Sequence, residues 1–155
     1  SKTGKNIALK DASGHFDAIG LGLDLTARDF QAECKAQGLP WEKAKAFDYS
    51  APMGEFKAKE YFADLSNIQF QLEINGQIRQ KGNSSQLLFP FDVVIGHVSK
   101  FITLEKGDLI FTGTPSGVGM ARGRFLQAGE LIVSGAEEIG ELRNACVAGI
   151  GPVAV

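Results

Sequence analysis

The chain has 155 residues, of which 44% are hydrophobic and 22% are charged, and its formal net charge is −2. This length suits one domain, and without a block of basic residues the chain lacks the electrostatic footprint of a nucleic-acid-binding protein. No apolar run approaches the roughly 20 residues that cross a bilayer, and the first residues do not resemble a signal peptide, so we expect a cytoplasmic protein that does not bind membranes.

The chain begins with a dozen polar residues, which we interpret as a loop. The apolar run from Phe16 to Leu23 follows, and it is interrupted by Gly20 and Gly22. Glycines inside an apolar run are typical of a buried strand that another backbone or a ligand approaches closely. The sequence therefore predicts a strand that leads directly to Asp24.

A short helix is predicted after this strand. Thr26 suits the N-cap position, and Gly38 followed by proline suits the end of the helix. Ala27, Phe30 and Cys34 recur at helical spacing and are predicted to form its buried face. The next stretch, from Leu39 to Phe56, has no clear period and is predicted to be irregular.

The strongest local signal is a hairpin. Apolar residues alternate with polar ones from Ile68 to Ile74, Asn75-Gly76 follows at once, and Ile78 continues the pattern. Strict alternation predicts a half-buried strand, and Asn-Gly favours a type I′ turn.

The second half of the chain predicts one more helix and several short strands. Pro90 opens the helix, and His97 lies on its apolar face, where we interpret it as a core histidine. We predict a short buried strand over residues 109–111, which ends at a glycine-rich loop, and further strands around 131–133 and 142–147. These elements predict one mainly β domain with short helices, an α+β roll or sandwich that covers residues 1–155.

Polar residues at the start of the first helix are the first candidates for chemistry. Asp24, Arg28 and Gln31 follow one another at intervals of four and three residues, so Arg28 and Gln31 should share a helix face with Asp24 just before it. A solvated helix face with a weak Asp–Arg pair explains the same spacing. Lys45 has no local feature that separates it from a surface lysine.

The glycine-rich loop is the second candidate. Gly113 and Thr114 open it, and the backbone N–H groups of such a loop can bind a carboxylate or an oxyanion. A tight structural turn is the alternative. Cys34 and Cys146 are too isolated for a metal site, and we interpret them as reduced thiols.

Five ordered motifs resemble the fumarylacetoacetate hydrolase family, and specifically its small members that act on acylpyruvates and oxaloacetate. The motifs are Gly22–Gln31, Gly38–Asp48, Ile74–Gln80, Thr103–Asp108 and Thr112–Gly119. The resemblance implies the mixed β-roll or sandwich of the C-terminal domain of that family, in a cytoplasmic homodimer. It also implies that this chain is the C-terminal part of a catalytic domain.

The resemblance also implies a chemistry and assigns residues to it. Mg²⁺ or Mn²⁺ would be bound by Asp24 and by two carboxylates of a Glu-x-Glu strand. This strand and a lid that carries a Glu–His pair would precede Asp24 in the family, and neither is found in this sequence, which we interpret as a fragment or as a degenerate member. Arg28, Gln31 and Lys45 would be the catalytic residues that bind and orient an oxo-acid substrate, and Gly113 with Thr114 would bind its carboxylate. The reaction would be acylpyruvate hydrolysis, or oxaloacetate decarboxylation or tautomerisation, through a metal-stabilised enolate. The alternative is a non-catalytic binding or assembly module that lacks a complete metal site.

Overall fold

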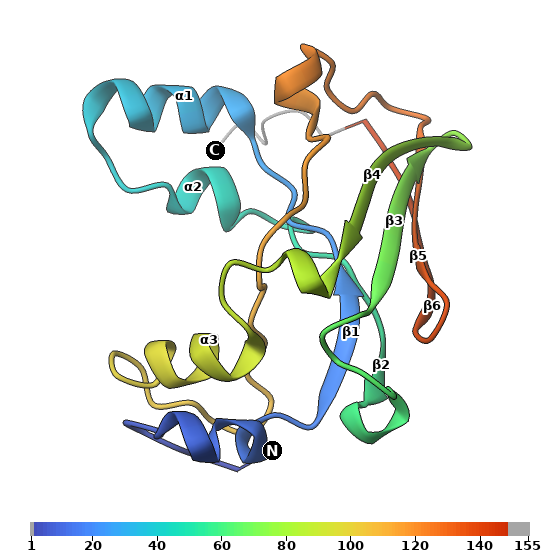
Figure 1. The fold of residues 1–155 in the computed structure, drawn as a ribbon. Coiled ribbons are helices and arrows are strands. Elements are labelled where there is room, and N and C mark those ends of the chain that lie inside the picture. Colours follow the sequence, from blue (N-terminus) through green and yellow to red (C-terminus); the bar gives the residue numbers. More distant parts are fainter. Residues whose placement is uncertain (1, 149–155) are drawn as a thin grey trace.

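Two antiparallel sheets form the framework of the chain in the computed structural model, which describes residues 2–148. The smaller sheet pairs β1 (Ala18–Gly22) with β2 (Met53–Ala58). The larger sheet has the strand order β4-β3-β5-β6. Its strands are β3 (Gln69–Ile74), β4 (Gln77–Asn83), β5 (Leu131–Ala136) and β6 (Gly140–Ala145). Figure 1 shows both sheets on one side of the molecule.

The main core holds the two sheets together. Leu21 of β1 and the following Leu23 pack with Ile132 of β5 and Leu142 of β6. All four side chains are at least nine-tenths buried, and burying such a side chain stabilises a fold by about 1.5–3 kcal/mol. The predicted architecture of antiparallel sheets with short helices is confirmed.

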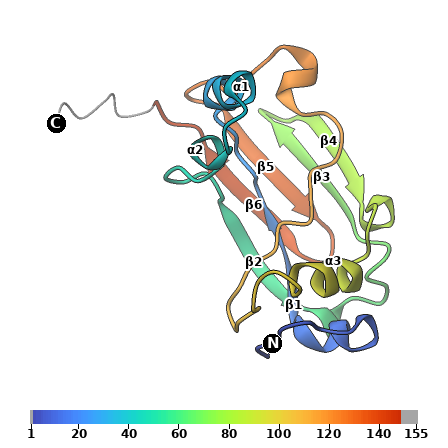
Figure 2. The same cartoon turned by 90° about the vertical axis from the view of Figure 1, so that its left-hand side faces the viewer.

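The helices lie at opposite ends of the sheets, as Figures 1 and 2 both show. At one end α1 (Arg28–Gln37) lies beside α2 (Glu42–Lys45). At the other end α3 (Phe91–Val98) packs on the 3₁₀ helix η1 (Leu9–His15) around a second, smaller core. The remaining 3₁₀ helices are η2 (Lys59–Tyr61), η3 (Ser84–Gln86) and η4 (Gly119–Arg122). Among residues 2–148 no helix is long and apolar enough to cross a membrane.

Several predicted elements are confirmed. The hairpin of β3 and β4 turns at Asn75 and Gly76, whose φ angles of 50° and 75° are both positive, as a type I′ turn requires. Gly38 ends α1 in the left-handed conformation, with φ 65°. Strand β1 passes closely under neighbouring side chains, because a Cβ on Gly22 would lie 2.7 Å from the Phe111 ring.

The N-terminal half also contains errors of prediction. The opening residues form η1 rather than only a loop, and the stretch 39–56 contains α2 and the start of β2. The N-cap of α1 is Ala27, which makes no side-chain cap, rather than Thr26. Phe30 is 45% exposed, whereas Gln31 is 6% exposed, because the helix turns Gln31 and Cys34 inward.

Two apolar features of the second half are also more exposed than predicted. Residues 109–111 belong to no strand, and Phe111 is 47% exposed. His97 is exposed on α3, where its ring lies 5.2 Å from that of Phe101. The buried positions of α3 are Ile95 and Gly96, which face η1 and the second core.

Candidate functional site

Asp24 is placed by the strand that precedes it. The backbone N–H of Leu23 donates to the Pro52 carbonyl at 2.9 Å, and that of Leu25 donates to the Ser50 carbonyl at 2.9 Å. Both leucines turn into the core, and side chains alternate along extended chain, so Asp24 between them points outward. The apolar pattern that packs the sheet therefore also presents the carboxylate.

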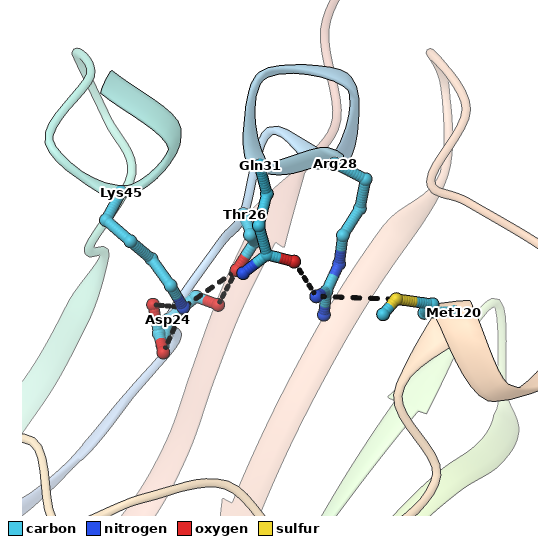
Figure 3. A network of polar contacts seen from close by, with 6 residues as sticks. All are labelled: Asp24, Thr26, Arg28, Gln31, Lys45 and Met120. Atoms are coloured by element: carbon cyan, nitrogen blue, oxygen red, sulfur yellow. Dashed lines mark hydrogen bonds and ion pairs between the residues drawn. The ribbon is translucent and has the colours of Figure 1, made fainter. Parts of the chain in front are cut away.

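Lys45 reaches Asp24 from α2. Its Nζ lies 2.7 Å from Oδ1 and 2.7 Å from Oδ2 of Asp24, and 2.9 Å from Oγ1 of Thr26 (Figure 3). Helix α2 is held there by the Ala27 N–H, which donates to the Ala44 carbonyl at 3.0 Å. The ion pair is partly exposed, so we assign it no more than about 1 kcal/mol of stability.

The neighbouring lysine behaves differently. Lys43 lies on the same short helix, but its Nζ pairs with Glu33 of α1 at 2.9 Å. That hydrogen bond to Glu33 raises the pKa of Lys43 above its usual value. The two lysines therefore have separate partners, although no local sequence feature distinguishes them.

Arg28 and Gln31 share one face of α1, as their spacing predicts. Arg28 Nη1 donates to Gln31 Oε1 at 2.8 Å, which fixes the guanidinium beside the buried amide. The same nitrogen lies 3.9 Å from Sδ of Met120 on η4. Figure 3 shows Lys45 and Met120 on opposite sides of the pair, so η4 stands beside α1 at the edge of the site.

The glycine-rich loop approaches the same region. Gly113, with φ 118°, has a conformation that residues with a Cβ rarely adopt, and Thr114 beside it is exposed. The Gln80 side chain donates to the Pro115 carbonyl at 3.1 Å. Gly117 packs so closely on β4 that a Cβ there would lie 2.1 Å from the Arg79 carbonyl oxygen. The loop is thus held firmly against the larger sheet.

A large open hollow joins these parts. It has a volume of about 2130 Å³, and its lining includes Asp24, Arg28, Gly113 and Thr114. Gln31 and Lys45 do not line it, but they contact Arg28 and Asp24 directly. The structure therefore gathers the predicted residues in one region, although the hollow exceeds the roughly 300–1,000 Å³ of ordinary small-molecule sites.

The residues present fit a divalent metal only in part. Asp24 offers carboxylate oxygens, which suit Mg²⁺ or Mn²⁺, but Lys45 contacts both of them. Within residues 2–148 no group of three or more His, Cys, Asp or Glu side chains could hold a metal ion. Asp24 can thus be one ligand, and the described chain does not supply a complete set.

The cysteines do not suit a nucleophilic role. Cys34 is buried, and Cys146 is partly buried on the wall of the hollow, both as free thiols. Burial raises the pKa of the Cys146 thiol, and the charge of Glu130 raises it further. The thiol form therefore dominates at neutral pH, and the reactive thiolate is disfavoured.

Sequence reasoning missed two contributors to this region. Thr26 accepts a hydrogen bond from Lys45 instead of capping α1. Met120 contacts Arg28 although 92 positions separate them, and no local pattern marks such a contact. The sequence did offer one signal for Thr26, because this threonine lies between the candidate residues Asp24 and Arg28.

Comparison with known proteins identifies close relatives. The family model described as "Fumarylacetoacetate (FAA) hydrolase C-terminal" matches residues 1–147. The chain is 42% identical over 129 residues to a mitochondrial oxaloacetate decarboxylase of Dictyostelium discoideum, with 83% of this chain and 59% of the relative covered. It is 45% identical over 119 residues to the mitochondrial oxaloacetate tautomerase FAHD1 of Homo sapiens, with 75% of this chain and 54% of the relative covered. The chain therefore spans little more than half the length of these relatives.

Solved structures agree with this similarity. A fumarylpyruvate hydrolase from Pseudomonas aeruginosa, in complex with Mn²⁺ and pyruvate, superposes with a TM-score of 0.88 at 34% identity. That match covers 96% of this chain and 62% of the other. A fumarylpyruvate hydrolase from Burkholderia cenocepacia, described as putative, gives a TM-score of 0.89 at 37% identity, with 97% and 65% covered.

Proposed function

The chain belongs to the fumarylacetoacetate hydrolase family, and on this premise we propose that it forms part of an enzyme that acts on small 2-oxo or 1,3-dicarbonyl acids. The reaction is acylpyruvate hydrolysis, or oxaloacetate decarboxylation or tautomerisation, as the names of its relatives suggest. The chain is then the C-terminal part of a catalytic domain.

The observation that carries this proposal is the pairing of Asp24 with Lys45 beside the pair of Arg28 and Gln31. The four side chains converge from α1, α2 and the segment that follows β1 (Figure 3). Cationic and amide donors suit the carboxylate and carbonyl oxygens of an oxo acid. Arg28, Gln31 and Lys45 would hold and orient such a substrate, and their donors would stabilise negative charge that develops on its oxygens.

The loop would hold the other end of the same group. The backbone of Gly113 and the hydroxyl of Thr114 are available for a carboxylate in the shared hollow. A positive φ at Gly113 is what allows the backbone to turn there. The substrate carboxylate would then lie between the loop and the donors of α1.

We propose that a divalent cation, Mg²⁺ or Mn²⁺, takes part and that Asp24 is one of its ligands. When bound, such an ion would supply Lewis acidity at the oxygens of the oxo acid. A structural relative contains Mn²⁺ with pyruvate, which supports the metal class. The described residues hold no group of three such ligands, and Lys45 must share Asp24 with the ion.

Turnover of oxaloacetate, acetylpyruvate and fumarylpyruvate by the whole protein, with Mg²⁺ or Mn²⁺ supplied, tests this function. We expect activity toward at least one of them and its loss in Asp24→Ala, because the variant removes a metal ligand and the partner of Lys45. Absence of activity from the unaltered protein would remove the enzyme proposal. Full activity in Asp24→Ala would remove Asp24 from the site.

The alternative is a binding or assembly module of the same family without catalysis. Calorimetric titration with Mg²⁺ and oxalate, a small chelating dianion, separates the two. Tight joint binding supports an enzyme site, whereas no joint binding favours the module. We also propose a cytoplasmic homodimer, and light scattering of the purified protein tests the dimer.

A further inference from the structure

We propose that Arg122, at the end of η4, determines substrate specificity by binding a second carboxylate of the substrate. This inference rests on the proposed function and deepens it, because it selects dicarboxylic oxo acids over monocarboxylic ones. The position of η4 relative to α1 is its first support.

Helix η4 lies at the edge of the candidate site. Met120 contacts the Arg28 guanidinium at 3.9 Å, and Figure 3 shows the two side chains pointing toward one another. Arg122 follows two positions later, about 4 Å further along a 3₁₀ helix. Both arginines line the same hollow as Asp24. We therefore place a two-ended ligand between Arg28 and Arg122 in this hollow.

The Arg122 guanidinium is largely uncommitted. Its Nη2 makes one long contact, at 3.5 Å, with the backbone carbonyl of Arg79. Residues 2–148 give it no other hydrogen bond and no ion pair with a carboxylate. An arginine carries five donors in a planar fork that matches a carboxylate, so Arg122 retains the donors for such a ligand.

The positive charges around Arg122 are balanced only in part, because the carboxylate of Glu130 lies near both Arg124 and Arg79. Arg124 pairs with the buried Glu130, and so this carboxylate is already engaged. Arg79 donates to the neutral Gln77 side chain at 2.7 Å, and its Nε is buried without a hydrogen-bond partner among the described residues. Three arginines of this wall, Arg79, Arg122 and Arg124, thus have one nearby carboxylate, and the remaining positive charge favours an anion there.

The backbone around this charge is firmly packed. A Cβ on Gly117 would lie 2.1 Å from the Arg79 carbonyl oxygen, and one on Gly119 would lie 2.3 Å from the Arg124 carbonyl oxygen. The segments that carry Arg79, Arg122 and Arg124 are thus in direct contact through glycines. Preorganised donors bind an anion with a smaller entropic cost than mobile ones.

The substrate would then lie across the hollow. Its 2-oxo carboxylate end faces Arg28 and the Thr114 loop, beside the pair of Asp24 and Lys45, and its second carboxylate faces Arg122. A solvated arginine without a ligand is the competing explanation. The two explanations differ in what Arg122 does to a pair of substrates with and without the second carboxylate.

Oxaloacetate and acetylpyruvate form such a pair, because a methyl ketone in the second replaces a carboxylate in the first. We would measure kcat, KM and calorimetric Kd for both acids with the whole protein and with Arg122→Gln and Arg122→Lys. The matched control is Arg143→Gln, since Arg143 pairs with Glu141 on β6 and does not line the hollow.

We expect Arg122→Gln to raise KM and Kd for oxaloacetate about tenfold, as for one lost charge-assisted hydrogen bond. KM and Kd for acetylpyruvate should change less than about twofold in the same variant. Arg122→Lys should bind oxaloacetate more tightly than Arg122→Gln, because lysine keeps the positive charge. Equal effects on both acids, or none on either, would overturn the inference.

Failure of the proposed function gives a different result. Arg122-dependent binding of oxaloacetate without turnover of oxaloacetate, acetylpyruvate or fumarylpyruvate would overturn the enzyme proposal and support the inference. Turnover of both acids that is indifferent to Arg122 would do the reverse. If the unaltered protein neither binds nor converts oxaloacetate, acetylpyruvate or fumarylpyruvate, both proposals fall.

Discussion

The contact between Gly117 and β4 can be tested by adding a single methyl group. In Gly117→Ala the new Cβ would lie 2.1 Å from the Arg79 carbonyl oxygen, a backbone atom that cannot move without disturbing the strand. The position also has φ 101°, which residues with a Cβ rarely adopt. The variant therefore suffers both backbone strain and a steric clash.

A matched variant separates the two effects. Gly113, in the same loop, has φ 118°, but no atom lies within 4 Å of the place that a Cβ would occupy. Gly113→Ala should therefore show the strain alone, about 2 kcal/mol of lost unfolding free energy. Gly117→Ala should lose about 4 kcal/mol, because a methyl forced into a filled space costs about 2 kcal/mol more.

Urea unfolding followed by circular dichroism gives both free energies, and the difference between the variants is the quantity of interest. A Gly117→Ala protein no less stable than Gly113→Ala would refute the packing of the loop on β4. That result would also weaken the specificity proposal, because the same packing joins Arg79 to η4.

Two further predictions concern ionisable side chains. Lys45→Met should lower kcat/KM at least about tenfold, because a charge-assisted contact to substrate is lost. The free energy of unfolding should change by less than about 1 kcal/mol. Steady-state kinetics with Lys43→Met as the control checks this, and equal losses of kcat/KM in both variants would contradict it. The Gln127 backbone N–H holds the pKa of Glu130 below its usual range, so the stability from this carboxylate is present above the unfolded pKa and lost as pH falls through the folded one. We would compare the free energies of unfolding of Glu130→Gln and the unaltered protein from about pH 3 to pH 7, which spans the ordinary pKa of a glutamate. The difference should be largest at neutral pH, and a difference that grows toward acid pH would contradict the assignment.

The elements that could be predicted are those that their own residues determine. Alternation from Ile68 to Ile74 with Asn75-Gly76 after it defines a hairpin locally, and the structure has that hairpin. The end of α1 at Gly38 was predictable because it depends only on the left-handed backbone conformation of that glycine. Elements of this kind can be predicted without knowing which distant residues they contact.

The elements that failed depend on distant partners or are too short for a period. Helix α2 has four residues, barely one turn, so no helical repeat can appear in it. Residues 109–111 are apolar enough for a buried strand, but a strand also needs a neighbour to pair with, and the described chain pairs none with them. Phe30 and Gln31 exchanged their predicted environments because α1 packs through Cys34 and Gln31.

The candidate site likewise contains contacts that local spacing predicts and contacts that depend on how distant segments pack. The spacing of Arg28 and Gln31 predicts their shared face, and the hydrogen bond between them agrees. Lys45 was singled out by family resemblance alone, and its contact with Asp24 depends on how α2 packs against the start of α1. Arg122 had no sequence signal, because its contact is with Arg79 of the distant strand β4.

The charges of these contacting residues indicate what the described part of the site can do by itself. In the cluster of contacting side chains, Lys45 and Arg28 outnumber the carboxylate of Asp24, although the chain as a whole has a net charge of −2. The wider hollow is also lined by other carboxylates, among them Asp29 and Asp48. Within that cluster, two cations beside one carboxylate suit an anion better than a cation. In the proposed enzyme these residues therefore bind and orient the oxo acid, while Asp24 is the point at which substrate donors and a metal ion would meet. Because Lys45 contacts both oxygens of Asp24, an ion that binds there must displace or share that ammonium, and the freed charge then lies beside the substrate oxygens.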